Sequence, residues 1–362
     1  MERSPFHYHG PLEPEQVSGR EELQRDLARR VMDRRVTALV GPRRYGKTSV
    51  LKRVAADLAQ VGPEPVWIDL YELSSISDLA AAVDRGLAAV RGPLRRALDS
   101  AAEGLSLRLG FVGVDLSRRR NQRPDPMLTL RSLLDVLVGV ARRREIFVVF
   151  DEFSGVAGVR GGAGALRTAL QHHYQDLGIV FAGSAPSTMR TLFSEESQPF
   201  FAQADLLEVG PMSDGDLRGV VEAGFEATGR SHGGHLDRLL HLADGHPQRA
   251  MQLADALWRF TGDPDTEPAE AWDRALASVR ASVDLGSERM YTLMPPGHRK
   301  VLRVVAQGGS IYGTAADIVD LAPGTAAAAV EALVGHGLLA RDESGLRVVD
   351  PLLADWLRRR FP

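Results

Sequence analysis

The stretch "GPRRYGKTSV", residues 41–50, decides how this 362-residue chain is read. It follows the apolar run "VTALV" and leads into "LKRVAADLAQ", a helical pattern. Gly41 and Gly46-Lys47-Thr48 fit the pattern G-x-x-x-x-G-K-[ST], in which backbone N–H groups turn towards phosphate. Lys47 supplies a cation for the β- and γ-phosphates, and the Thr48 hydroxyl is a ligand for Mg²⁺. With a strand before it and a helix after it, this loop predicts a nucleotide site.

A pair of carboxylates follows a second apolar run, "IFVVFDEF", residues 146–153. We expect Asp151 to hold Mg²⁺ and Glu152 to polarise the attacking water. The alternative is an acidic pair that merely ends a strand. Adjacent Asp and Glu after such a strand favour an ATP hydrolase over a small-molecule kinase.

A polar residue, Ser184, ends the next apolar run, "GIVFAG". At the end of a strand it would lie near the γ-phosphate and sense it. The same hydroxyl is also suited to cap the helix predicted for "APSTMRTLF". Both roles remain open.

The composition is that of an ordinary globular protein, 44% hydrophobic and 25% charged, with a net charge of −3. This balance gives no global indication of a nucleic-acid or membrane partner. The absence of cysteine excludes disulfides, thiolate metal sites and cysteine nucleophiles. No apolar run approaches the roughly 20 residues of a membrane span, and the N-terminus lacks the apolar core of a signal peptide. We therefore expect a cytoplasmic protein.

The first half of the chain alternates strand-like and helical patterns, which predicts an α/β fold with a parallel sheet. Strands are expected at 37–40, 66–70, 146–150, 179–182 and 206–209, and helices at 47–60, 76–90, 127–143 and 166–176. An insert separates the second and third strands. Alternation over 105–116 predicts a hairpin there, and the arginine-rich stretch from 117 onward predicts an exposed loop, with contact to nucleic acid or an acidic partner as the alternative.

The second half is helical from Ser213 to Trp258, and a linker, "TGDPDTEP", follows at 261–268. A further helix is expected to end near Leu285. Helical patterns and then two β-like runs around Gly345 fill the last segment, which is the order of a winged helix. The predicted domains are an N-terminal segment with the P-loop core (1–212), a helical domain with its connecting helix (213–290), which the resemblance described next identifies as a lid, and a winged helix (291–362).

Several motifs together resemble the archaeal-type AAA+ ATPases near the origin-recognition branch, which overlap the STAND class of signalling ATPases. In chain order they are "VSGREEL", "GPRRYGKTS", "VVFDEF", "FAGSAPSTM", "PFF", "ADGHPQRA" and "DPLLADWLRRR". The resemblance implies an αβα sandwich with a parallel sheet, a helical lid and a C-terminal winged helix. It implies ATP or ADP with Mg²⁺ as ligands, and it leaves a homo-oligomer open.

The resemblance also extends the candidate site. Arg20 and Glu21 match an element near the adenine, and Gly245-His246-Pro247 match the lid motif on the other side of the nucleotide. Arg249 is placed either as a phosphate sensor on the lid or as a solvated helix arginine. The expected nucleotide contacts are Arg20, Gly41, Pro42, Arg43, Arg44, Tyr45, Gly46, Lys47, Thr48, Ser49, His246, Pro247 and Arg249; the expected catalytic residues are Lys47, Asp151, Glu152 and Ser184, with Thr48 and Asp151 at the metal.

One departure from the family pattern concerns the arginine finger. Many relatives carry an arginine after the P-[LF]-[YF] element, where this chain has Gln203 in "PFFAQA". Arg190 and Arg167 are substitute candidates. Without a finger, which is worth about 10³–10⁵ in related phosphoryl transfer, we expect slow hydrolysis. A slow ATPase suits a molecular switch that acts on a separate protein partner.

The candidate recognition helix of the winged helix is "PGTAAAAVEALVGHG", residues 323–337, with Thr325 as the expected cap. Its one charged residue is Glu331, whereas base reading and phosphate anchoring need cationic or amide side chains. We therefore favour packing or partner docking over an ATP-gated, DNA-binding initiator or loader. The histidines of "FHYH" and "QHH" lack carboxylates at ligand spacing, so no metal site is expected there. Phe6 and Tyr8 are expected to pack onto the core.

Overall fold

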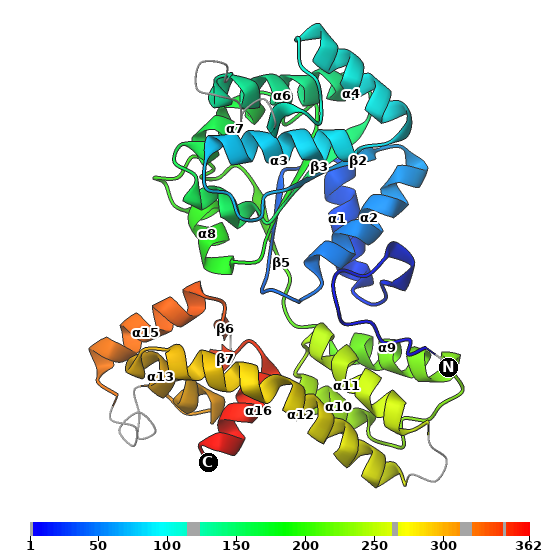
Figure 1. Ribbon diagram of the computed structural model, residues 1–362, viewed down its shortest axis with the longest axis vertical. Coiled ribbons are helices and arrows are strands. Elements are labelled where there is room, and N and C mark those ends of the chain that lie inside the picture. The colour runs from blue at the N-terminus through cyan, green and yellow to red at the C-terminus, as the bar shows by residue number, and fades with distance from the viewer. Residues whose placement is uncertain (1–2, 114–123, 263–266, 312–320, 343–344) are drawn as a thin grey trace.

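The computed structural model describes residues 3–113, 124–262, 267–311, 321–342 and 345–362. A sheet with helices on both faces forms one body (Figure 1). A group of helices, the lid, and a winged helix lie side by side beneath it. The chain visits these bodies in the order that the sequence predicts.

The main sheet holds all five strands predicted from apolar runs. They are β1 (Thr37–Val40), β2 (Glu64–Asp69), β3 (Ile146–Asp151), β4 (Gly178–Gly183) and β5 (Asp205–Glu208). The order is β2-β3-β4-β1-β5, and every neighbouring pair is parallel. Because β3, β4 and β1 are parallel neighbours, their carboxyl ends lie next to one another at one end of the sheet.

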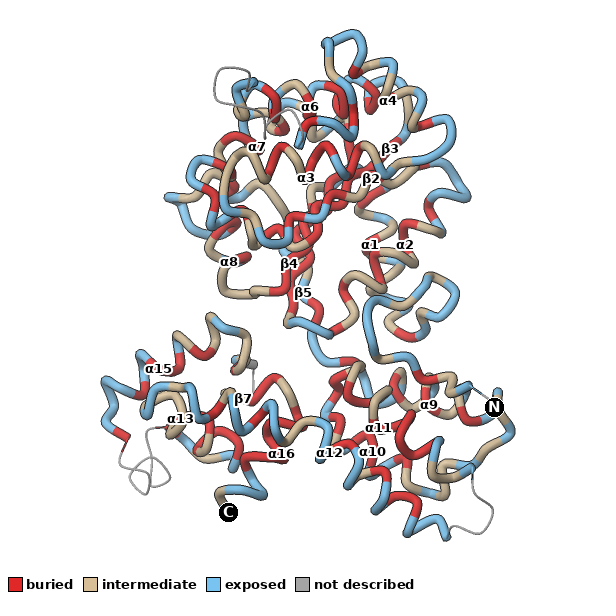
Figure 2. Tube along the Cα trace, in the orientation of Figure 1, coloured by how far each residue is buried: buried red, intermediate tan, exposed pale blue. Residues whose placement is uncertain are grey.

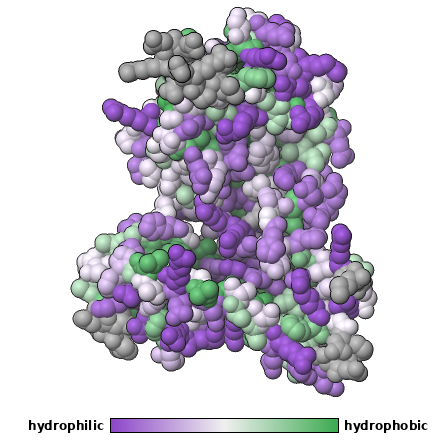
Figure 3. Space-filling model, in the orientation of Figure 1, coloured by the Kyte–Doolittle hydropathy of each residue, from purple (hydrophilic) through white to green (hydrophobic). Residues whose placement is uncertain are grey.

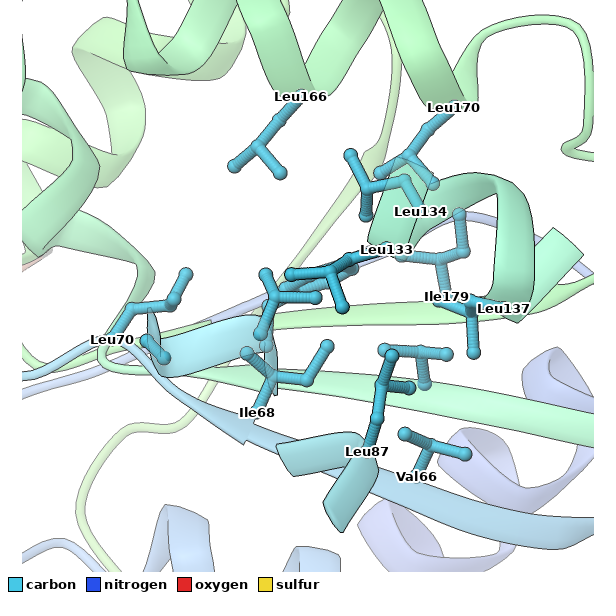
Figure 4. Packing of buried hydrophobic residues seen from close by; sticks show 14 of the residues in the cluster. Val66, Ile68, Leu70, Leu87, Leu133, Leu134, Leu137, Leu166, Leu170 and Ile179 are labelled. Carbon is cyan, nitrogen blue, oxygen red and sulfur yellow. The ribbon is translucent and has the colours of Figure 1, made fainter. Parts of the chain in front are cut away.

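Alternate residues of each strand face opposite layers, as the pleat requires. Val148 and Phe150 face a cluster that includes α3 (Ile76–Ala89), α4 (Gly92–Gly104), α6 (Pro126–Ala141), α7 (Gly162–Leu170) and α8 (Pro186–Ser194). Figure 4 shows leucines of α6 and α7 packed over β2 in this cluster. Phe147 and Val149 face the other layer, formed by α1 (Glu21–Met32) and α2 (Lys47–Val61). The double cover explains why the inner strands β1, β3 and β4 are buried throughout and almost uniformly apolar.

Two predictions for the core were wrong. Residues 105–113 form no strand, and the structure does not describe 114–123, which hold the rest of the predicted hairpin and the arginine-rich loop. The Asp84 carboxylate of α3 accepts the N–H groups of Gly110 and Val112 at 2.8 and 3.1 Å, which holds this backbone against α3 instead of a hairpin partner. The helix expected over 166–176 is α7, which ends at Leu170; the residues that follow form turns, in which His173 and Asp176 pair at 3.2 Å.

The lid consists of α9 (Asp214–Ala227), α10 (Leu236–Ala243) and α11 (Pro247–Phe260), which pack with the first part of α12 (Pro268–Leu293) around one buried cluster. The helix end predicted near Leu285 was wrong, since α12 continues to Leu293. Tyr291 near its end packs on Trp356 with ring centroids 5.4 Å apart, so α12 enters the core of the winged helix. One continuous helix therefore joins the lid to the winged helix.

The winged helix contains α13 (Pro296–Ala306), α15 (Pro323–Gly335), the antiparallel pair β6 (Leu339–Asp342) and β7 (Gly345–Val348), and α16 (Pro351–Arg360). The middle helical pattern predicted for this domain falls largely on 312–320, outside the described residues. Thr325 is not the cap of α15, which begins at Pro323 after Ala322. Proline suits the first helical position because it has no N–H to leave unpaired.

Burial follows these layers, with buried positions concentrated on the sheet and on the inner sides of the helices (Figure 2). The surface in the same orientation is mainly hydrophilic, with hydrophobic atoms in small separate patches (Figure 3). None of the described helices is long and apolar enough to cross a membrane.

Candidate nucleotide site

The loop between β1 and α2 needs glycine at both of its ends. A Cβ atom at Gly41 would lie 2.5 Å from the carbonyl oxygen of Val209, so only glycine fits beside the end of β5. Gly46 caps α2 with a φ of 87°, in the left-handed region that favours glycine. The predicted strand, loop and helix are confirmed, and the N-terminus of α2 opens at Lys47. Such a helix end presents N–H groups and a partial positive charge to an anion.

Lys47 is held at the mouth of the loop. Its Nζ donates to the carbonyl oxygens of Gly41 and Pro42, at 2.7 Å each, and the residue is only 6% exposed. Burial lowers the pKa of Lys47 to about 8, although the charges of Glu152 and Asp151 act in the opposite direction. The ammonium group is therefore poorly solvated, and an anion at the loop would stabilise its charge.

Thr48 and Asp151, the two expected metal ligands, come together from α2 and β3. The Thr48 hydroxyl donates to Asp151 Oδ2 at 3.2 Å. Burial raises the pKa of Asp151, while the N–H of Glu152, which donates to Oδ1 at 3.0 Å, acts against the rise. The described residues contain no group of three or more His, Cys, Asp or Glu side chains able to hold a metal ion alone. The donor set thus fits Mg²⁺, which takes few protein oxygens and completes its shell with phosphate and water.

Glu152 lies directly beyond β3 in a left-handed backbone conformation, with a φ of 51°. Its Oε2 accepts a hydrogen bond of 2.6 Å from the hydroxyl of Ser184, which follows β4 and is 8% exposed. The alternative role of Ser184 as the cap of α8 is not seen, since Ala185 occupies that position without a side-chain cap. A non-glycine residue in this conformation is strained by roughly 1–3 kcal/mol, which is typical of functional sites.

A cavity of about 520 Å³ connects these groups. Its volume lies within the usual range for ligand sites, roughly 300–1,000 Å³. The core contributes Arg43, Arg44, Gly46, Lys47, Thr48, Ser49, Glu152 and Ser184, and the lid contributes Pro247, Gln248 and Met251. The cavity therefore lies between the carboxyl edge of the sheet and the first turns of α11.

One wall of this cavity was missed from the sequence: residues 7–12, ahead of the first helices. The N–H of Leu12 donates to Ser49 Oγ at 3.0 Å, and Gln248 Nε2 donates to the carbonyl of Tyr8 at 2.9 Å. Phe6 and Tyr8 were predicted to pack onto the core, but Phe6 is buried in the lid cluster with Phe225, and Tyr8 lines the cavity. The aromatic and histidine run "FHYH" was the only local signal, because the wall forms against residues that are distant in sequence, Ser49 and Gln248.

Other predicted contacts lie outside the lining of the cavity: Arg20, Gly41, Pro42, Tyr45, Asp151, His246 and Arg249. Arg20 donates to the carbonyl of Gly210 at 2.7 Å. Tyr45 is fully buried, and its hydroxyl donates to the carbonyl of Val349, beyond β7, at 3.2 Å. Its ring lies 4.8 Å from that of His246. Tyr45 thus joins the P-loop to both the lid and the winged helix.

Arg249 on α11 is buried, so it is not a solvated surface arginine. Its guanidinium makes paired hydrogen bonds to both carboxylate oxygens of Asp350, with Nε to Oδ1 at 3.0 Å. Asp350 also caps α16 by accepting the N–H of Leu352 at 3.0 Å. The predicted phosphate-sensing role of Arg249 remains a prediction; in this structure the side chain joins the lid to the winged helix.

Comparison with known proteins gives similarity in structure alone. No protein-family model matches the sequence, and no curated protein matches it. A Walker-type ATPase of Pyrococcus abyssi is similar over 98% of this chain and 99% of its own, with a TM-score of 0.72 and 20% identity. The ORC2 protein of Aeropyrum pernix, in ADPNP and ADP complexes, is similar over 98% and 96%, with a TM-score of 0.61 and 14% identity. The chain has the fold of the archaeal origin-recognition AAA+ ATPases. A third AAA+ neighbour, Aeropyrum pernix ORC1 in complex with DNA, covers 95% of this chain and 93% of its own, with a TM-score of 0.51 and 16% identity.

Within this AAA+ fold, none of the arginine-finger candidates reaches the cavity. Arg190 pairs with Glu208 at 2.7 Å on the surface. Gln203, at the position of the usual finger, donates to the carbonyl of Phe201 at 3.3 Å. Neither of these residues nor Arg167 lines the cavity.

Proposed function

We propose that this protein is a molecular switch that binds ATP with Mg²⁺, hydrolyses it slowly, and thereby controls how the lid and winged helix are held against the ATPase core. The observation that carries the proposal is Tyr45. This P-loop residue lies next to Gly46 in the chain and is bonded to Val349 of the winged helix. A change in the loop that accompanies phosphate binding would therefore reach the winged helix directly.

Each polar residue of the site has a separate role in the proposed hydrolysis. Lys47 binds the β- and γ-phosphates, and Thr48 and Asp151 hold Mg²⁺, which neutralises phosphate charge when it is bound. Glu152 accepts a proton from the attacking water, and Ser184 fixes the carboxylate that does so. The nucleotide complexes of ORC2 from Aeropyrum pernix, a protein of the same fold, support ATP and ADP as ligands.

The switch would act through a junction of consecutive residues. Val349 belongs to the buried cluster of Tyr45 and Val50 in the core, whereas Leu352 belongs to the cluster of the lid. Asp350, between them, pairs with Arg249 of the lid. This short segment of the winged helix therefore contacts both the core and the lid. A movement of the core relative to the lid would displace the segment and change its contacts with both.

Two substitutions test the site. We expect Lys47→Ala to abolish ATP binding, because the buried cation at the phosphate is lost. We expect Glu152→Gln to bind ATP normally but to lower turnover by about 10²–10⁴-fold, since the proton acceptor is gone. Titration with a fluorescent ATP analogue and phosphate release measure the two effects. Lys52→Ala is the matched control, because Lys52 lies on the same helix, pairs with Glu13 and does not line the cavity. Equal hydrolysis by Glu152→Gln and wild type would contradict the assignment.

The alternative is an ATP-gated DNA-binding initiator or loader, as the DNA complex of ORC1 from Aeropyrum pernix suggests. The candidate recognition helix α15 has no arginine or lysine, and it contacts α8 of the core. We therefore propose a protein as the partner. A gel shift at low salt with ATP is expected to show no duplex binding; a salt-sensitive, ATP-dependent shift would favour the alternative. Affinity purification with ATP-bound Glu152→Gln would identify the partner.

A further inference from the structure

Arg43, the first of the paired arginines in the P-loop, is an expected nucleotide contact that lines the cavity, but the hydrolysis proposed above gives it no catalytic role. We propose that Arg43 is a catalytic arginine acting in cis on the terminal phosphate, in place of the finger whose usual position holds Gln203. This inference rests on the proposed ATPase function.

The geometry attaches Arg43 to the catalytic pair. Its Nε donates to Ser184 Oγ at 3.3 Å, and the same hydroxyl donates to Glu152 Oε2 at 2.6 Å. Arg43 also lines the cavity together with Lys47, Ser184 and Glu152. A guanidinium, a hydroxyl and a carboxylate from the P-loop, β4 and β3 therefore form one hydrogen-bonded chain on the cavity wall.

The donors of Arg43 suit a phosphate. Among the described residues, Nε is the one Arg43 nitrogen with a hydrogen-bond partner, so both Nη groups remain available. A guanidinium is always charged and presents its N–H groups as a planar fork that matches phosphate oxygens. Lys47, by comparison, already donates to two carbonyl oxygens of its own loop.

The other arginines near the site have different contacts. Arg249 is paired with Asp350, Arg190 with Glu208, and Arg20 with the carbonyl of Gly210. Arg44 lines the cavity but makes no contact with Ser184 or Glu152 among the described hydrogen bonds. Arg43 is therefore the arginine that the fold places on the catalytic pair without help from another subunit.

In the proposed step, the oxygen of a water molecule bonds to the γ-phosphorus while the bond between that phosphorus and the β–γ bridging oxygen breaks. ADP leaves with the electron pair of that bond, and Glu152 takes the proton of the water. Negative charge increases on the bridging and γ-phosphate oxygens in the transition state, and the guanidinium of Arg43 offsets it.

The experiment compares Arg43→Ala, Arg43→Lys and a control, Arg53→Ala, at an arginine of α2 that pairs with Asp57 and does not line the cavity. Turnover is measured as phosphate release, and binding is measured for ADP alone and for ADP with aluminium fluoride, which mimics the transferred phosphoryl group. We expect Arg43→Ala to lower turnover by about 10³-fold or more. We also expect it to lose the fluoride-dependent gain in ADP affinity while retaining affinity for ADP alone. The turnover of Arg43→Lys is expected to lie between those of wild type and Arg43→Ala, because lysine keeps the charge without the planar fork. Arg53→Ala is expected to behave as wild type.

The outcomes separate this inference from the proposed function. If wild type hydrolyses ATP and Arg43→Ala keeps both its turnover and its aluminium fluoride complex, the role of Arg43 is overturned and the ATPase stands. If wild type shows no turnover, both are overturned. A cis arginine also requires turnover per molecule to be independent of protein concentration. A rise with concentration that persists in Arg43→Ala would instead assign the arginine to a neighbouring copy.

Discussion

At the scale of single residues, the state of Lys47 decides when the loop can hold phosphate. The lysine is buried, with a pKa near 8, so a large part of the free protein has a neutral Lys47 in mildly alkaline solution. Because the folded pKa lies below the ordinary value of 10.5, unfolding takes up protons between about pH 8 and 10.5. The contribution of Lys47 to stability therefore improves as the pH rises through this window.

Nucleotide binding should respond to pH in the opposite direction. Phosphate raises the pKa of Lys47, so binding takes up a proton near pH 8, and the affinity should fall above that pH by up to about tenfold per pH unit. Calorimetric titration of ADP at pH 8 in two buffers with different ionisation enthalpies measures the proton uptake. Identical heats in both buffers would show that Lys47 is already fully charged. The same titration at pH 6.5 is the control, where uptake by Lys47 should be small.

At the scale of elements, the junction between β7 and α16 combines a helix cap with an ion pair. Burial by itself would raise the pKa of Asp350, but the hydrogen bonds and charge of Arg249 lower it overall. A depressed carboxyl pKa stabilises the fold above the unfolded value, about 3.9, and this contribution is lost as the pH falls through the folded pKa.

Asp350→Asn separates the two roles of this carboxylate. Asparagine is a good helix cap, so α16 should keep its start, whereas the partly buried Arg249 loses its counter-charge. We expect the free energy of unfolding to fall by about 1–3 kcal/mol, less than for a fully buried pair. Urea denaturation at pH 7 measures the change. Glu208→Gln is the control, since its pair with Arg190 is exposed and should contribute less than about 1 kcal/mol. Equal decreases in the free energy of unfolding for Asp350→Asn and Glu208→Gln would contradict a special contribution of the Asp350–Arg249 pair.

The elements also show what the sequence could predict. The inner strands β1, β3 and β4 were predictable because burial on both faces makes each one a short apolar run. The outer strands β2 and β5 are only partly buried, and their shorter apolar stretches were still sufficient. Asp151, Glu152 and Ser184 were found because each follows such a run. The alternating pattern over 105–113 led to a wrong prediction of a hairpin, because the Asp84 side chain of α3 binds the backbone N–H of Gly110 in that segment. The wall at residues 7–12 and the contacts of Tyr45 were not predictable, since they depend on partners distant in sequence, such as Gln248 for Tyr8 and Val349 for Tyr45.

At the scale of the whole molecule, Tyr45 joins the core to the winged helix, and Tyr45→Phe tests that connection. The ring and its packing remain, but the hydroxyl no longer donates to Val349, which costs about 1 kcal/mol, and no longer accepts from the Arg347 guanidinium, both of whose Nη atoms lie 3.3 Å from it. We expect ATP affinity to be unchanged, because the hydroxyl faces away from the cavity. Hydrogen exchange over residues 345–352 should be faster by roughly fivefold. Tyr71→Phe, at an exposed tyrosine, is the control. Unchanged exchange at the junction would remove Tyr45 from the proposed switch.

The bond between Tyr45 and Val349 also has a consequence for biosynthesis, because it spans 304 residues. At synthesis rates of about 5–20 residues per second, the ribosome needs roughly 15–60 seconds after adding Tyr45 before Val349 exists. Once synthesis has passed Glu208, all strands and the phosphate loop of the core are made, but until Val349 is added the tyrosine behind the loop has no acceptor. The nascent chain can therefore contain most of the nucleotide site before the Tyr45–Val349 hydrogen bond, which connects that site to the winged helix, is able to form.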